Sequence, residues 1–275
     1  MMLLKVSGPG KQNKRAGNHC NLKAGVINIY ALHVKDLSYT YRTGNRPALE
    51  NITFKVAAGE TLGVVGLNGS GKTTLSYCLC GIIPHYFYGM MTGTVTVKGM
   101  DTRKTPLLQL TDEVGIVLQD PNVQLLMPTV EDDIAFGLEN RKLQPEIIRE
   151  KIEQLLELTG TTHLRHENPN RLSGGEKQLI ALATVLAMDP SIIVFDESLS
   201  MLDRAGTEKI IRVMQLLKKR GTTMVLIDHT GKGHLVYDKI FILEEGKIIR
   251  RGPRDQIIAD RQFLMDHKLL STWEG

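Results

Sequence analysis

Apolar residues in the first third of the chain alternate with polar ones, which is the pattern of strands that bury one face. A compact apolar run at Thr61–Val65 ends in a glycine-rich turn, and a further run at residues 94–97 ends at Gly99. Both runs predict strands that stop at turns. Alternating strands of this kind are typical of an antiparallel sheet with one face on the core. The alternating positions are Leu32/Val34, Tyr39/Tyr41 and Ile52/Phe54/Val56.

Later segments are either wholly apolar or repeat with the spacing of a helix. Spacings of three and four residues predict helices over residues 146–158 and 210–217. Strands that are apolar on both faces and alternate with helices imply a parallel sheet that is covered on both sides. We therefore expect one mixed α/β domain over residues 31–265. The wholly apolar runs are residues 192–195, 224–227 and 240–243.

The N-terminal region lacks this periodicity and carries the net charge. Residues 1–33 contain five Lys and Arg side chains and no acid, and the remaining 29 basic and 30 acidic side chains leave the rest at −1. The formal charge of +4 is therefore not a basic face for nucleic acid. We predict a flexible basic extension over residues 1–30, near anionic lipid or simply solvated, and a short tail over 266–275. If translation starts near Val26, the cellular product lacks the extension.

Cysteine content and hydropathy exclude two further classes. The three cysteines, Cys20, Cys78 and Cys80, match neither a disulfide framework nor a zinc signature. Cys78 and Cys80 lie in an apolar run, which predicts buried free thiols in a reducing compartment. No run approaches the 18 consecutive apolar residues that a membrane-spanning helix needs. Any connection to a membrane is therefore expected to come through a partner.

A glycine-rich loop follows the strand predicted at Thr61–Val65, and a helix-compatible run follows the loop. The loop fits G-x-x-x-x-G-K-[ST], whose glycines let backbone N–H groups turn inward around phosphate oxygens. Lys72 is expected to reach the β- and γ-phosphates, and the Thr73 hydroxyl to hold Mg²⁺. The order of strand, loop and helix argues against a chance glycine-rich turn. The predicted ATP-binding residues here are Gly66, Leu67, Asn68, Gly69, Ser70, Gly71, Lys72, Thr73 and Thr74.

Two adjacent acids end the apolar strand at residues 192–195. Asp196 is expected to hold Mg²⁺, mostly through water, because that ion gives up its hydration shell reluctantly. Glu197 is placed to orient and polarise an attacking water. A pair of solvated acids is the plainer interpretation of an isolated strand end. The phosphate loop upstream favours the catalytic interpretation.

A second helix start with glycines lies at residues 172–178, which read LSGGEKQ. Ser173 and Glu176 have the spacing of a capping box, so an ordinary helix start explains part of the pattern. Gly174 and Gly175 would each lower the stability of a helix interior by roughly 1 kcal/mol. Paired glycines are useful where a phosphate approaches backbone N–H groups closely. We therefore predict that Ser173, Gly174 and Gly175 bind a second phosphate.

The three motifs at residues 66–73, 172–178 and 192–197 together resemble an ABC-type ATPase in order, spacing and length. The resemblance extends from about Val34 to Gly252. It implies a P-loop α/β fold with a mixed sheet core, an antiparallel β subdomain and a helical signature subdomain. It also implies that two such chains pair head to tail. Each ATP would then lie between the phosphate loop of one chain and the signature helix of the other.

The resemblance assigns two further residues to the nucleotide. Tyr41 resembles the aromatic residue that stacks on adenine. Tyr39 is the competing choice, and a strand aromatic that faces the core is the structural alternative. Gln119 follows a strand predicted at residues 114–118 and resembles the glutamine that contacts Mg²⁺ and the attacking water.

The last family motifs lie near the second acidic strand and after the strand at residues 224–227. Leu202 and Asp203 resemble the D-loop that crosses to the partner, and His229 resembles the histidine near the γ-phosphate. A lone histidine at a strand end is otherwise usually structural. Two positions depart from the pattern: Ser198 stands in place of a proline, and Asp228 in place of a threonine or small residue. Neither removes a catalytic group, and both bear on rate and loop rigidity. The implied catalytic residues are Lys72, Gln119, Glu197 and His229.

Two runs narrow the resemblance further. Residues 119–124 read QDPNVQ and residues 130–140 read VEDDIAFGLEN, and both are similar to energy-coupling-factor and cobalt-type importers. The implied function is an ATP-hydrolysing subunit at the cytoplasmic face of the membrane, which powers import of a metal ion or vitamin. A transmembrane coupling subunit is expected to dock between Gln119 and Asn140. A surface acidic helix is the plainer interpretation of that segment.

Related ATPases outside transport form the competing class. Chromosome-maintenance and repair ATPases insert a long coiled coil between the two phosphate motifs, whereas Lys72 and Ser173 are only 101 residues apart. Translation-factor relatives carry two such domains, and this chain shows one. We therefore favour a transporter subunit over a soluble ABC ATPase in nucleic-acid or ribosome-linked processes, and we expect no nucleic-acid partner.

Overall fold

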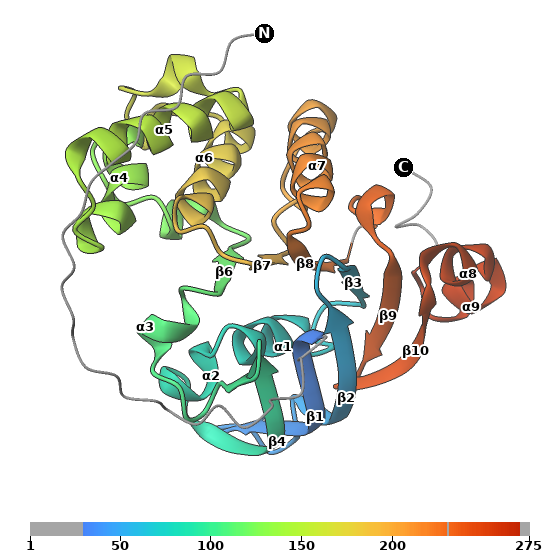
Figure 1. Ribbon diagram of the computed structural model, residues 1–275. Coiled ribbons are helices and arrows are strands. Elements are labelled where there is room, and N and C mark those ends of the chain that lie inside the picture. The colour runs from blue at the N-terminus through green and yellow to red at the C-terminus, as the bar shows by residue number, and fades with distance from the viewer. Residues whose placement is uncertain (1–29, 230, 270–275) are drawn as a thin grey trace, which may run out of the picture.

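Two β-sheets with helix α1 (Lys72–Leu79) between them form the centre of the molecule (Figure 1). The computed structural model describes residues 30–229 and 231–269. The extension predicted over residues 1–30 lies outside the described residues apart from Tyr30, and the chain beyond residue 269 lies outside them too. Both flanking segments therefore stay predictions.

The smaller sheet is antiparallel, with the order β2-β1-β4-β5. The larger sheet has the order β10-β9-β3-β8-β7-β6, in which β10 is antiparallel to β9 and every other pair is parallel. The alternating segments thus pair antiparallel and the wholly apolar runs pair parallel, as predicted. The strands are β1 (Tyr30–Tyr41), β2 (Leu49–Ala57), β3 (Thr61–Val65), β4 (Gly89–Val97), β5 (Met100–Asp101), β6 (Val114–Val117), β7 (Ile192–Asp196), β8 (Thr223–Asp228), β9 (Lys239–Glu244) and β10 (Lys247–Pro253).

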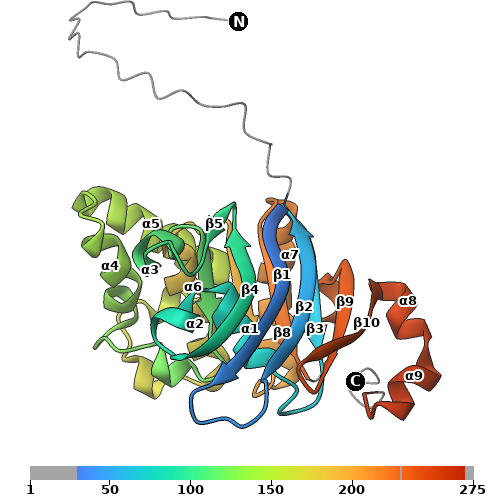
Figure 2. The same cartoon turned by 90° about the horizontal axis from the view of Figure 1, so that it is seen from below.

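The buried apolar residues form three clusters between the sheets and the helices. One cluster fills the space between the two sheets around α1, and a second lies between the other face of the larger sheet and helices α6 and α7. A third is enclosed by α4, α5 and α6. Figure 2 shows α4 and α5 at one end of the molecule and α8 and α9 at the other. The helices after α1 are α2 (Ile82–His85), α3 (Leu107–Leu110), α4 (Val130–Asn140), α5 (Pro145–Thr159), α6 (Gly174–Ala187), α7 (Arg204–Lys219), α8 (Arg254–Ala259) and α9 (Arg261–Asp266), with short 3₁₀ turns at η1 (Pro121–Val123), η2 (Thr162–Leu164), η3 (Pro169–Arg171) and η4 (His234–Val236).

The register of the parallel strands brings four loops to one edge of the sheet. Val65 of β3 pairs with Asp228 of β8, and Asp196 of β7 pairs with Ile227 of β8. Val117 of β6 pairs in turn with Phe195 of β7. The carboxyl ends of these strands are therefore level, and in open α/β sheets this edge is where ligands bind.

Most of the predicted elements are present, and several others carry no clear sequence pattern. The helices predicted at residues 146–158 and 210–217 correspond to α5 and α7, and α4 is a helix over the acidic segment. Strand β10 was not expected, because its apolar positions do not alternate and three of its seven residues are Lys or Arg. Cys78 and Cys80 are buried free thiols, and burial raises the pKa of both.

A close contact between β3 and the segment before β9 limits one position to glycine. A Cβ atom on Gly63 would lie 2.6 Å from the ring of Tyr237, which is itself buried. Tyr237 Oη donates a hydrogen bond of 3.2 Å to Asp228 Oδ2, so the ring is held from its far end.

Gly63→Ala is therefore expected to destabilise the fold by about 1–3 kcal/mol, because the added methyl group overpacks a rigid contact. Chemical denaturation with fluorescence detection measures the effect. The double variant Gly63→Ala/Tyr237→Leu should recover part of the loss through the smaller side chain. Equal stability of Gly63→Ala and the unaltered protein would contradict this packing.

Candidate phosphate and catalytic site

The loop between β3 and α1 is shaped as a cradle for an anion. Gly71 caps α1 with a φ of 103°, and Gly69 has a φ of 80° with no heavy atom near its added Cβ. A Cβ on Gly66 would lie 2.1 Å from the carbonyl oxygen of Leu243, so a side chain does not fit there. The buried Ser70 hydroxyl has no hydrogen-bond partner among the described residues. Positive φ values and an unpaired hydroxyl at a helix N-terminus suit phosphate oxygens.

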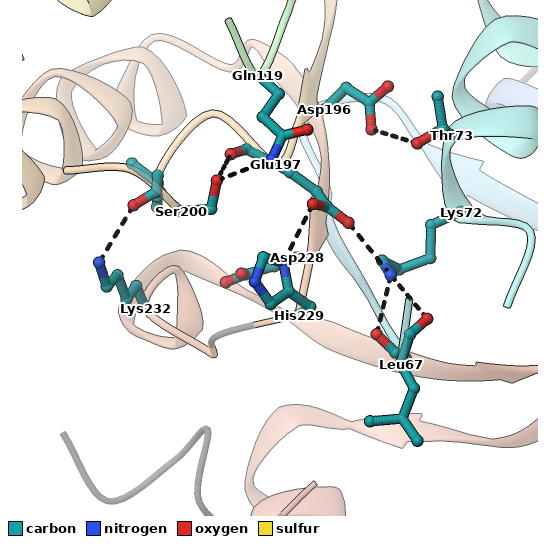
Figure 3. Close-up of polar contacts among 12 residues, drawn as sticks. Leu67, Lys72, Thr73, Gln119, Asp196, Glu197, Ser200, Asp228, His229 and Lys232 are labelled. Carbon is teal, nitrogen blue, oxygen red and sulfur yellow. Dashed lines mark hydrogen bonds and ion pairs between the residues drawn. The ribbon is translucent and has the colours of Figure 1, made fainter. Parts of the chain in front are cut away.

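A buried lysine and a glutamate meet beside this loop (Figure 3). Lys72 Nζ donates to the carbonyl oxygens of Gly66 and Leu67 at 2.9 and 3.0 Å, and lies 3.2 Å from Glu197 Oε1. The second carboxylate oxygen of Glu197 lies 3.1 Å from Nδ1 of His229. Three predicted catalytic side chains, from α1, the end of β7 and the end of β8, are thus brought together. The backbone of Glu197 has a φ of 50°, a left-handed conformation that is uncommon away from glycine.

The side chain of Asp196 is more deeply buried than that of Glu197, and neighbouring groups neutralise its negative charge less well. Its Oδ2 accepts a hydrogen bond of 2.9 Å from Ser76, and its Oδ1 lies 3.5 Å from the Thr73 hydroxyl. Burial raises the pKa of Asp196 to about 6, the neighbouring charge of Glu197 adds to the rise, and the hydroxyl donors and Lys72 oppose it. A carboxylate and a hydroxyl side by side are oxygen donors of the kind that Mg²⁺ prefers.

Gln119 joins the site through a serine. Its Nε2 lies 3.4 Å from Ser200 Oγ, and Ser200 Oγ donates a hydrogen bond of 2.7 Å to the carbonyl oxygen of Glu197. The segment after β6 and the turn after β7 are therefore connected next to Glu197, as Figure 3 shows. The sequence placed Gln119 at a strand end, and the structure adds the intermediate hydroxyl.

The two candidate tyrosines of β1 occupy different environments. Tyr39 is fully buried and its hydroxyl donates to the carbonyl oxygen of Phe87 at 3.2 Å. Tyr41 is half-buried, and its hydroxyl shares a hydrogen bond of 3.0 Å with Thr74 at the start of α1. Tyr41 is thus the tyrosine of the pair that reaches the phosphate-loop helix, and Tyr39 is the one that faces the core.

The second predicted phosphate motif lies in a separate pocket. Ser173 and Glu176 form the capping box of α6, and hydrogen bonds from Ser173 lower the pKa of Glu176. A pocket of about 290 Å³ runs from Ser173–Glu176 to the start of α7, whereas the pocket beside the phosphate loop has a volume of about 330 Å³ and different walls. A Cβ on Gly175 would lie 3.5 Å from the Cα atom of Gly206, and the space beside Gly174 is open. Both glycines therefore line the pocket, and a side chain on Gly175 would be in ordinary contact with α7.

The two departures from the family pattern are both buried. Ser198 lies in the turn after Glu197, and its hydroxyl has no partner among the described residues. Asp228 accepts hydrogen bonds from the Gly233 amide at 3.3 Å and from Tyr237 Oη at 3.2 Å. Asp228 therefore anchors the chain on either side of η4.

Two residues of the site, Ser76 and Ser200, were not predicted from the sequence. Ser76 lies three positions after Thr73, so the helical period alone places both hydroxyls on one face toward Asp196. Ser200 lies in the turn after Glu197, two positions before Leu202, and no role was predicted for it. Its contact with Gln119 spans 81 positions, and the local sequence contains no signal for it.

A glycine cradle at a helix start, with a buried aspartate at the end of a nearby parallel strand, defines the class of P-loop nucleoside triphosphatases. A family model described as "ABC transporter" matches residues 49–200. The chain belongs to this family, and its enzymatic class is that of an ATPase.

Individual relatives are similar over most of the chain. The energy-coupling factor transporter ATP-binding protein EcfA1 of Mycoplasmoides gallisepticum is 37% identical, over 86% of this chain and 82% of its own length. The structure of cbiO1 from Clostridium perfringens, part of the ABC transporter complex cbiONQ, has a TM-score of 0.76 at 30% identity, covering 86% of this chain and 94% of that one. The ATP-binding cassette MJ0796, a dimer bound to ADP and phosphate, has a TM-score of 0.71 at 25% identity, covering 81% and 98%.

Within residues 30–229 and 231–269, no helix combines the length and the apolar character that crossing a bilayer requires.

The buried charge of Asp196 yields a prediction about stability. With a chelator and without nucleotide, Asp196→Asn is expected to raise the free energy of unfolding at pH 7.5 by about 1–2 kcal/mol, because a neutral amide avoids desolvating a carboxylate. The native carboxyl binds its proton more tightly than the unfolded one, so the contribution of Asp196 to stability falls as the pH rises from about 4 to about 6. The difference between the two proteins should therefore shrink as the pH falls below 6.

Thermal unfolding at pH 5 and pH 7.5 measures this difference. A melting temperature of Asp196→Asn below that of the unaltered protein at pH 7.5 would show that Asp196 is stabilising where it lies.

Proposed function

We propose that this chain is the ATP-hydrolysing subunit of an energy-coupling-factor type importer, with a metal ion or vitamin as cargo. The observation that carries the hydrolytic activity is the convergence of Lys72, Glu197 and His229 beside an anion-binding loop. The names of EcfA1 and of the cbiONQ component support the importer class over a nucleic-acid or ribosome-linked ATPase. The cargo itself rests on the resemblance of residues 119–140 to those importers.

The proposed chemistry is in-line attack of water on the γ-phosphate of ATP. Lys72 stabilises negative charge on the phosphoryl oxygens, and Glu197 orients the water and accepts its proton. Lys72 lies 3.2 Å from one oxygen of Glu197 and His229 lies 3.1 Å from the other, so each oxygen of this carboxylate has a nitrogen-bearing neighbour. Tyr41 is proposed to stack on adenine, since it is half-buried and tied to the start of α1.

Thr73, Asp196 and Gln119 are the proposed ligands of Mg²⁺. Their side chains supply hydroxyl, carboxylate and amide oxygens, and the proximity of Thr73 to Asp196 fits a small hard cation. When bound, Mg²⁺ would neutralise charge on the β- and γ-phosphates. Ser76 donates to the other carboxylate oxygen of Asp196, Oδ2, and so orients the carboxylate.

A second ATPase subunit is the proposed partner, arranged head to tail. Ser173, Gly174 and Gly175 line a pocket apart from the phosphate loop, so they suit the phosphates of a nucleotide on the other chain. The partner is a second copy or a close relative. The dimeric post-hydrolysis structure of MJ0796 supports pairing of this kind.

A membrane subunit is proposed to dock on the segment from Gln119 to Asn140. This segment exposes large apolar side chains that a surface helix rarely leaves in water: Leu126 is 75% exposed, Val123 61% and Phe136 53%. The connection of Gln119 to Ser200 would relay movement of that subunit to the catalytic turn. The chain would then lie at the cytoplasmic face of the membrane, held there by its partners.

Glu197→Gln is expected to bind ATP and dimerise, and to hydrolyse ATP about 10²–10³-fold more slowly than the unaltered protein, because the amide does not accept the proton of water. Phosphate release and size-exclusion chromatography with ATP measure the two properties. Glu157→Gln on the exposed face of α5 is the matched control and should keep normal turnover. Normal turnover in Glu197→Gln would remove Glu197 from the catalytic role.

Phe136→Ser is expected to abolish co-purification of a polytopic membrane protein, because docking would bury this ring. Nucleotide affinity should be unchanged, since Phe136 lies on α4. Leu216→Ser, at an exposed apolar position of α7, serves as control. The measurement is affinity purification from detergent-solubilised membranes with identification of partners by mass spectrometry. Equal recovery with both variants would contradict docking on α4.

A further inference from the structure

Lys232 connects the chain beyond His229 to the turn beyond Glu197. Its Nζ donates to the carbonyl oxygen of Leu202 at 2.9 Å and lies 3.3 Å from that of Leu199. Figure 3 shows this side chain reaching across from the segment after β8 to the turn that carries Ser200. Lys232 is half-buried, so its hydrogen bonds are partly shielded from water. We name residues 199–203, between Glu197 and α7, the D-loop segment.

The residues around Lys232 fix its position. Gly231 has a φ of 66°, a conformation that disfavours other residues. A Cβ on Gly233 would lie 2.7 Å from Tyr237 Oη, and the Gly233 amide donates to Asp228. Asp228 and Tyr237 therefore fix the backbone at Gly233, next to Lys232. This leaves the lysine stem to extend toward the D-loop segment.

The D-loop segment is in turn packed against the signature helix. Asp203 Oδ1 accepts from the Gly206 amide at 2.8 Å and caps α7. Gly206 lies near Gly175 at the start of α6, where a Cβ atom on either glycine would be 3.5 Å from the Cα atom of the other, and residues 201–203 share a pocket with Ser173. A displacement of residues 199–203 therefore shifts the floor of the pocket beside Ser173.

We propose that Lys232 is a positioning residue that couples the two nucleotide half-sites of one chain. His229, at the chain's own nucleotide, lies three positions before Lys232, and Lys232 holds the segment that leads to the signature helix. Movement of His229 is thus passed to the surface that would serve the nucleotide of the partner. This inference rests on the proposed function for the roles of His229 and the signature helix, whereas the Lys232 contact stands on the structure.

Hydrogen–deuterium exchange on the full chain tests the proposal, in dilute solution where light scattering shows a monomer. The probe is a non-hydrolysable ATP analogue with Mg²⁺, and the compared peptides cover residues 66–74 and 199–206. In the unaltered protein the analogue should slow exchange in both peptides. In Lys232→Met it should slow exchange at residues 66–74 equally, while the response at residues 199–206 is lost and exchange there without analogue rises about tenfold.

Two further variants separate coupling from general stability. Lys232→Arg retains donors for the two carbonyl oxygens and should restore most of the response. Lys219→Met makes the same change at an exposed position of α7 and should leave both peptides unchanged. In steady-state assays, Lys232→Met should lower kcat about tenfold with KM within about twofold, because binding by the phosphate loop is untouched.

An unchanged response of residues 199–206 in Lys232→Met, or an equal loss in Lys219→Met, would overturn the proposal. Failure of the proposed function gives a different result, because the analogue would then leave residues 66–74 unprotected in the unaltered protein. In that case the exchange rate of residues 199–206 without analogue still tests whether Lys232 stabilises the D-loop segment. Equal exchange rates in Lys232→Met and in the unaltered protein would show that it does not.

Discussion

Strand β8 is hydrogen-bonded on both sides, and the geometry of the site depends on this double pairing. Its residues Ile227 and Asp228 lie opposite Asp196 of β7 and Val65 of β3. A slip of one residue in either ladder would exchange the side chains that pack on the two covered faces of this fully buried strand, and both cores would have to repack, so the register is strongly fixed. The phosphate loop, the acidic turn and the end of β8 therefore keep their relative positions. Backbone pairing thus orders the side chains that meet at this edge before any ligand arrives, which is the condition for effective electrostatic catalysis.

The two neighbouring acids at this edge, Asp196 and Glu197, lie in very different surroundings. Glu197 faces a lysine and a histidine, whereas Asp196 is buried with two hydroxyl groups as its nearest donors. The rise in the pKa of Asp196 follows from that difference, with burial as the main cause. The fold thus holds a carboxylate where water solvates it poorly, which is unfavourable for stability and suits a site that recruits a cation. The buried Asp196 carboxylate thus destabilises the fold locally, and binding of a cation there would offset that loss of stability.

The sequence predicted those parts of the site that are encoded locally. The glycine loop, the acids at the end of β7 and the apolar strands follow from short patterns, and the structure places Lys72, Glu197 and His229 together. Long-range contacts left no such trace: Ser76 meets Asp196 across 120 positions, and Lys232 meets Leu202 across 30. Strand β10 was missed because it is an edge strand whose side chains are mostly exposed, so its residues lack a buried face. The different burial of Tyr39 and Tyr41 could not be predicted either, since alternation puts both on one face.

The separation of the phosphate loop from the signature pocket affects how much ATP is hydrolysed by chains that are not assembled in a complex. If each complete site forms only where two chains meet, the rate in dilute solution grows with the square of the chain concentration. An unassembled chain would then leave ATP almost untouched, without any inhibitor. Tethering two chains to one membrane subunit would raise their effective concentration to the millimolar range and favour pairing without further contacts. Placing half of each site on each chain would thus restrict ATP hydrolysis to assembled complexes.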